Sequence, residues 1–117
     1  MILTKKDSRK KAELVNVLGT AATALEEAKN NNTLEENKHL ITDYNVIALK
    51  VQAFVDDVAG DFREKYDNKS DEWRDSDDGQ AADEFINAWE SFSIEEADDE
   101  GNFENMESEF DSLPEES

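Results

Sequence analysis

The sequence predicts an all-α protein: an antiparallel helical hairpin with a long second helix, then a third amphipathic helix and a short acidic C-terminal helix. Apolar residues recur at spacings of three and four in four separate stretches, which is the period of an amphipathic helix. Residues that start or stop helices lie between these stretches. A length of 117 residues fits one domain with one modest core. We therefore expect residues 1–117 to form a single helical domain.

The first helix is predicted to begin at a cap formed by Asp7 or Ser8 and to end near Lys29. Gly19 lies within it, where glycine costs about 1 kcal/mol relative to alanine. We interpret this glycine as a point of close packing against another helix. The apolar stripe steps by 4, 3, 4 and 3 along Leu14, Leu18, Ala21, Leu25 and Ala28.

The second helix is predicted to run from a capping box, with Thr33 as N-cap and Glu36 three residues later, to about Tyr66. The preceding asparagines, 30–32, accept left-handed backbone and end helices well. So short a connection favours an antiparallel hairpin, and the heptad-like stripe also allows a homodimer through that hairpin. The stripe comprises Leu40, Tyr44, Ile47, Val51, Phe54, Val58 and Phe62.

A third helix is predicted to start at Ser76, a good N-cap, with Asp77 and Asp78 in its first turn, where the helix dipole favours acids. Its apolar face comprises Ala81, Ala82, Phe85, Ile86 and Trp89, and we expect this face to pack on the hairpin.

The C-terminal region is predicted to contain a fourth helix from about Asn102 to Leu113, with Pro114 as its stop. Its apolar residues step by 3, 4 and 3 along Phe103, Met106, Phe110 and Leu113. The preferred interpretation is a helix docked on the rest of the chain. The alternatives are a helix that orders only on a partner, and a disordered tail.

The net charge of −19 is concentrated in one part of the chain. Residues 1–70 contain eleven Lys or Arg and twelve Asp or Glu, whereas residues 71–117 contain one Arg and nineteen Asp or Glu. The first part is therefore a charge-balanced scaffold, and the second is strongly acidic. Such a charge repels nucleic acid and anionic membranes and attracts basic surfaces. A basic group at the start, Lys5, Lys6, Arg9, Lys10 and Lys11, is interpreted as a solvated helix start or as an internal partner of the acidic part.

Catalytic chemistry is not indicated. There is no cysteine, His39 is the only histidine, and no phosphate-binding glycine loop occurs. We therefore expect no enzyme activity and no cofactor. No secretory signal or membrane span is recognised, so the cytoplasm of a host cell is the expected location.

One weak metal motif occurs between Glu96 and Glu107, which has the length of an EF-hand calcium loop. Its candidate ligands are Glu96, Asp98, Glu100 and Glu107. Glu96 stands where Asp is expected, so calcium binding is the least favoured of the binding hypotheses.

Acids fixed on helices can imitate the charge spacing of a nucleic-acid backbone, because residues three or four apart share a helix face and duplex DNA carries a regular phosphate array. The imitation requires that the carboxylates be held in place. The candidate partner-binding residues in the better-ordered part are Asp71, Glu72, Asp75, Asp77, Asp78, Asp83, Glu84 and Glu90. Those that extend the surface are Glu95, Glu96, Asp98, Asp99, Glu100, Glu104, Glu107 and Asp111.

In size, acidity and helical character the chain resembles the DNA-mimic anti-defence proteins of bacteriophages, a likeness of class rather than of alignment. Locally, the segment 69–92 is similar to one in small uncharacterised phage proteins, through Ser70, Trp73, Ser76, Gly79, Phe85 and Trp89. The class resemblance implies an inhibitor of a restriction, CRISPR or recombination enzyme that occupies its basic nucleic-acid-binding cleft. The alternative function is an acidic adaptor whose stripe Phe103, Met106, Phe110 and Leu113 enters a groove on a partner.

Overall fold

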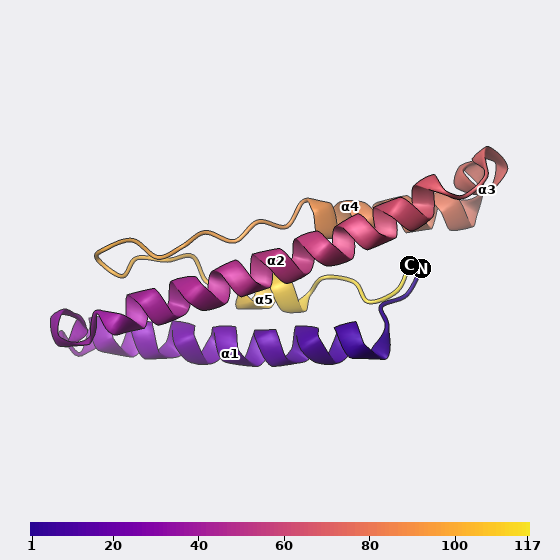
Figure 1. Cartoon of the computed structure of the whole chain (residues 1–117). Helices are drawn as coiled ribbons and strands as arrows, with labels where there is room; N and C mark the ends of the chain where they lie inside the picture. The colour runs from indigo at the N-terminus through magenta and orange to yellow at the C-terminus, as the bar shows by residue number, and fades with distance from the viewer.

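The computed structural model describes all 117 residues and shows an elongated all-α protein. Its two long helices, α1 (Lys5–Asn30) and α2 (His39–Asp67), form the antiparallel hairpin that the sequence predicts (Figure 1). The molecule measures 59 × 23 × 17 Å, and its radius of gyration is 17.2 Å, against about 13 Å for a compact chain of this length. The length of α2 sets this extended shape.

Helix α1 begins earlier than predicted, because Thr4 is its N-cap: the Thr4 hydroxyl accepts a hydrogen bond from the Asp7 N–H at 3.1 Å. The prediction of Asp7 or Ser8 as the cap was wrong. The predicted apolar stripe is confirmed with one difference: Ala22 is buried, whereas Ala21 is only half-buried. The buried residues of the stripe are Leu14, Leu18, Ala22, Leu25 and Ala28.

The connection between the long helices differs from the predicted capping box. Asn32 adopts the left-handed backbone expected of this asparagine run, with φ of 57°. A short 3-10 helix, η1 (Leu34–Asn37), then precedes α2. The Thr33 side chain caps no helix, and its hydroxyl instead lies 3.4 Å from the carbonyl of Ala28. The first turn of the predicted helix is therefore 3-10, and α2 starts at His39.

The acidic part begins with two consecutive helices, α3 (Asp71–Asp75), which the sequence did not predict, and α4 (Asp77–Glu90), which it did. The Ser76 hydroxyl caps α4 by accepting from the Gly79 N–H, as expected. Helix α4 packs on the second half of α2 through edge-on aromatic pairs. Phe62 and Phe85 have ring centroids 5.0 Å apart, and Phe54 and Trp89 6.0 Å apart.

After α4 the chain runs without helix back along the hairpin, turns near residue 101 and returns to a short helix, α5 (Glu107–Asp111) (Figure 1). The fourth helix is therefore shorter than predicted, and Asn102 is not its cap. The apolar residues predicted for it are nevertheless packed on the chain's own core: Met106, Phe110 and Leu113 are buried and Phe103 is half-buried. The docked interpretation is confirmed.

The two ends of the chain meet beside the start of α1 (Figure 1). The Leu3 N–H donates to the Glu115 carbonyl at 2.7 Å, and the Ser117 N–H donates to the Met1 carbonyl at 2.8 Å. Lys11, only 4% exposed, donates from Nζ to the carbonyls of Asp111 at 2.8 Å and Leu113 at 3.0 Å. The first carbonyl belongs to the last residue of α5 and the second lies just after this helix, so a cation from the basic start of the chain fixes the acidic end.

Candidate acidic partner-binding surface

The corner between α3 and α4 presents two helix starts in succession. Each is capped by a serine: the Ser70 hydroxyl accepts from the Trp73 N–H, and the Ser76 hydroxyl from the Gly79 N–H, both at 3.2 Å. Acids fill each first turn, where the helix dipole lowers the energy of a negative charge. The exposed acids of the two helices are Asp71, Glu72, Asp75, Asp77, Asp78, Glu84 and Glu90.

The backbone of this corner has little freedom. A Cβ on Gly79 would overlap the Trp73 carbonyl and the backbone of Arg74, so only glycine permits so close an approach. The Trp73 ring packs edge-on against Tyr66 of α2 at 6.1 Å, and the Lys69 ammonium lies 5.1 Å from the same ring. The acids of the corner are therefore carried by backbone that is anchored to α2. Asp71 also pairs with Arg74.

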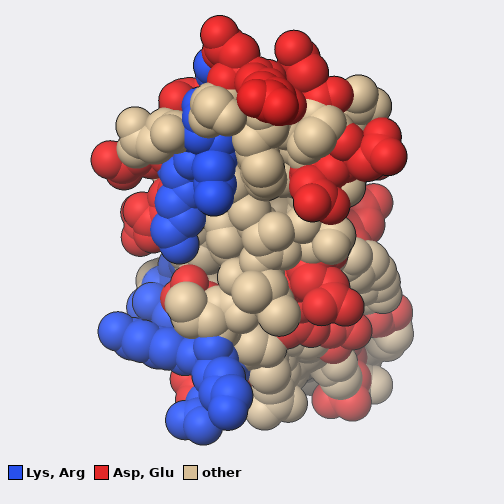
Figure 2. All heavy atoms as spheres, turned by 90° about the vertical axis from the view of Figure 1, so that its right-hand side faces the viewer, with Lys and Arg blue, Asp and Glu red and all other residues tan.

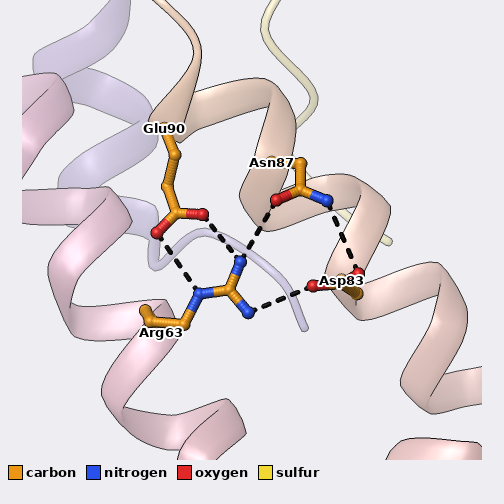
Figure 3. A network of polar contacts seen from close by, with 4 residues as sticks. All are labelled: Arg63, Asp83, Asn87 and Glu90. Carbon is orange, nitrogen blue, oxygen red and sulfur yellow. Dashed lines mark hydrogen bonds and ion pairs between the residues drawn. The ribbon is translucent and has the colours of Figure 1, made fainter.

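Two of the predicted contact residues, Asp83 and Glu90, are engaged within the chain by Arg63 of α2 (Figure 3). Arg63 donates from Nη1 to Asp83 at 3.1 Å, and from Nε and Nη2 to both oxygens of Glu90 at 3.2 and 2.6 Å. Its Nη2 also donates to the Asn87 amide oxygen at 3.2 Å. The hydrogen bonds that Arg63 donates to Glu90 are the main reason that the pKa of Arg63 is raised above its ordinary value. These two acids tie α4 to α2, so less of their charge is available to a partner than the sequence suggested.

The extended segment that follows α4 is attached to α2 by two side-chain amides. Asn45 donates from Nδ2 to the Ala97 carbonyl at 3.2 Å and accepts from the Ala97 N–H at 2.6 Å. Gln52 likewise donates to the Phe92 carbonyl at 3.3 Å and accepts from the Ile94 N–H at 2.9 Å. These bonds satisfy backbone groups that have no secondary structure to pair with. Glu95 and Glu96, both exposed, lie between the two attachments.

A tight turn, Asp98 to Asn102, forms the tip of the molecule at the hairpin connection. The Asp98 carboxylate accepts from the backbone N–H groups of Glu100 and Asn102, both at 2.9 Å, and from the Asn102 side chain at 3.2 Å. These bonds lower the pKa of Asp98, and the bond from the Asn102 N–H contributes most. Gly101 has φ of +77°, and Lys29 of α1 donates to the Asn102 side chain at 2.7 Å. The turn thus holds the exposed acids 99 and 100 at a fixed place.

The EF-hand candidates are not brought together. The Asp98 carboxylate serves its own turn, and Glu107 lies half-buried over Gly19 of α1, where its carboxylate would be 2.5 to 2.6 Å from an added Cβ. No group of three or more Asp, Glu, His or Cys side chains in the chain is arranged to hold a metal ion. The close approach at Gly19 confirms the predicted role of that glycine.

The predicted surface residues therefore lie along the whole molecule rather than on one patch. The corner α3–α4 is at one end, the Asp98 turn at the other, and Glu104 and Asp111 are exposed on the returning segment and α5 (Figure 1). Acids of the charge-balanced part, not predicted as contacts, add to both ends. Glu35 borders the same hollow as Glu100, and an exposed series on one face of α2 leads toward the corner: Asp57, Asp61 and Glu64. Their helical spacing was visible in the sequence, but their position was not.

Charge is segregated at the α3 end of the molecule. Figure 2 shows Lys and Arg gathered on one side, with Asp and Glu over the top and the opposite side. Lys5, Lys6 and Arg9 are exposed at the start of α1 and form no ion pair within the chain. Lys11, by contrast, is the internal partner of the acidic part that one interpretation predicted. The remaining bases therefore leave an acidic face uncompensated.

Comparisons with protein-family models, with curated proteins and with solved structures find no match for this chain. None of the helices is both long enough and apolar enough to cross a membrane.

Proposed function

We propose that this protein is a DNA mimic that occupies the basic nucleic-acid-binding cleft of a host protein and inhibits it, as phage anti-restriction and anti-CRISPR proteins do. The observation that carries the proposal is the attachment of exposed acids to constrained backbone at both ends of a long, narrow molecule. Fixed carboxylates do not have to be ordered when the partner binds, so their attraction to Lys and Arg is not offset by that entropy cost.

The dimensions fit this role. A length of 59 Å corresponds to about 17 base pairs at ~3.4 Å per base pair. A nuclease cleft that follows duplex DNA would meet carboxylates at both ends of the molecule and along the extended segment between them. Inhibition is then competitive, and binding is fast and strongly dependent on salt.

The adaptor alternative is less favoured, because its apolar stripe is already used. Met106, Phe110 and Leu113 are buried in the chain's own core. They would reach a groove on another protein only if the C-terminal segment left the hairpin, together with the bonds from Lys11 and Tyr44 that hold it.

The test begins with identification of the target by capture from a host lysate and elution in a salt gradient. A variant with three corner acids neutralised, Glu72→Gln, Asp75→Asn and Asp78→Asn, is then compared with a control that loses three acids from α1: Glu13→Gln, Glu26→Gln and Glu27→Gln. None of the six is in an ion pair in this structure.

At about 0.5–1 kcal/mol for each exposed charge, the corner variant should bind about 10- to 150-fold more weakly. The α1 control should change the affinity less than about threefold, and duplex DNA should compete with the wild type. If the two variants lose equal affinity, net charge alone explains the binding, and the proposal of a positioned acidic surface is refuted. Failure of duplex DNA to compete would refute the mimicry.

A further inference from the structure

One side of the α1–α2 hairpin is left uncovered by the rest of the chain. The returning segment and α4 pack on other faces of α2, and a groove of about 510 Å³ remains between the two long helices. It is lined by Val17, Thr20, Ala21, Ala24, Leu40, Asp43, Val46 and Ile47. Two of the lining side chains are large, apolar and exposed: Val17 by 41% and Val46 by 46%. Leu40 and Ile47, which belong to the predicted apolar stripe of α2, are only half-buried because they face this groove.

The charges on this side of α2 are symmetric about its apolar centre. Asp43, Val46, Ile47 and Lys50 follow one another at steps of three, one and three, which places them on one face of the helix. Asp43 and Lys50 therefore lie at equal distances on either side of the Val46–Ile47 pair. Both are exposed, and neither forms an ion pair within the chain.

This pattern is complementary to itself when reversed. If two α2 helices cross antiparallel with the midpoint of Val46 and Ile47 at the centre, Asp43 of each copy lies opposite Lys50 of the other. A twofold interface requires this reciprocity, in which residue i meets residue j and j meets i. The apolar residues between the two ion pairs would then be buried against one another.

Electrostatic repulsion also favours this face over others. Two copies that each carry −19 repel strongly, but residues 1–70, which hold the whole groove, have a net charge of only −1. The acidic α3–α4 corner follows the end of α2 at Asp67, about 30 Å from the proposed centre at 1.5 Å per residue. In an antiparallel pair the two corners would point away from each other, which keeps most of the acidic charge apart.

We propose that the uncovered hairpin face is a twofold interface between two copies of this chain, centred on Val46 and Ile47, with reciprocal Asp43–Lys50 ion pairs. The bulk of the contact is apolar, from Val46, Ile47, Val17 and the other residues that line the groove. The interface uses none of the acids assigned to the partner surface, so it stands or falls separately from the proposed function.

The experiment is sedimentation equilibrium of the purified full chain over a range of concentrations. The wild type should approach twice the chain mass of 13.3 kDa. Val46→Glu should shift the protein to the monomer, whereas Ala81→Glu, which adds the same charge at an exposed position of α4, should leave the dimer in place. Circular dichroism melting of each variant shows that the fold is retained, since Val46 is 46% exposed.

A charge exchange then tests the register. Asp43→Lys and Lys50→Asp should each raise the dimer dissociation constant about 3- to 10-fold, and the double exchange should restore it, because the reversed pairs remain complementary. A wild type that stays monomeric at about 200 μM overturns the proposal, even if a different protein is then found to bind this face. A dimer that survives Val46→Glu, or a double exchange that stays weak, overturns it as well.

Discussion

Replacement of Lys11 by methionine tests how the acidic end of the chain is held. The Lys11 ammonium is buried and donates to two carbonyls at the end of α5 and just after it, those of Asp111 at 2.8 Å and Leu113 at 3.0 Å. Hydrogen bonds from a charged group contribute about 1.5–3 kcal/mol each, and the lost desolvation of the ammonium offsets part of this. Methionine fills the apolar part of the site but leaves both carbonyls without this donor. We expect a loss of about 2–4 kcal/mol in the free energy of unfolding.

The assay is urea unfolding at pH 7, followed by the fluorescence of Trp89 in a Trp73→Phe background. The Trp89 indole donates to the Pro114 carbonyl at 2.8 Å and therefore reports directly on the same segment. Lys6→Met is the matched control, since it removes one cation from the same helix at an exposed position. Its effect should stay within about 0.5 kcal/mol. If the two variants lose equal stability, long-range charge rather than the two buried bonds is responsible, and the reasoning fails.

Three further predictions concern other parts of the frame. Gly60→Ala on α2 should raise the free energy of unfolding by about 0.5–1 kcal/mol, because the added Cβ meets nothing within 4 Å. Gly79→Ala should lower the free energy of unfolding by more than about 1 kcal/mol, because its Cβ would overlap backbone atoms. Chemical denaturation measures both variants, and a gain in stability at Gly79 would contradict the prediction. The Asp98 turn should contribute stability above about pH 4 and lose it as the pH falls through the lowered pKa of folded Asp98, because protonation removes a hydrogen-bond acceptor. The stability of Asp98→Asn should therefore approach that of the wild type at low pH. A stability difference between the two proteins that does not depend on pH would count against this role of the turn. Arg63→Met should lower the free energy of unfolding by about 1–3 kcal/mol, because it leaves the carboxylate of Glu90 unpaired. The measurement is the midpoint of thermal unfolding, which should fall; an unchanged midpoint would show that these ion pairs do not stabilise the fold.

The helices were predictable because their signals are local. The stripes of the two long helices and the Ser76 cap depend on residues within one or two turns of each other, and the structure confirms them. The errors occur where one residue can serve two local structures, or where an element is too short to show a pattern. Thr33 satisfies the pattern of a capping box, yet its hydroxyl bonds backward to the carbonyl of Ala28. The α3 helix has only five residues, too few to show a period.

The candidate surface was predictable in composition but not in arrangement. One arginine of α2 binds both Asp83 and Glu90 of α4, across sequence separations of 20 and 27 residues. That an extended segment would be fixed by Asn45 and Gln52 depends on side chains whose partners lie 52 and 42 residues away. No period in the sequence reports such pairs.

The sequence by itself determined the all-α class, the hairpin and the concentration of acid in residues 71–117, because helix formation and charge depend on neighbours along the chain. Only the tertiary structure decided which acids are free, which apolar residues of the hairpin are left uncovered, and how the C-terminal segment is held. These depend on which faces of α2 other segments cover: the returning segment covers one side of α2, so Tyr44 and Val51 are in the core while Val46 and Leu49 stay exposed to solvent.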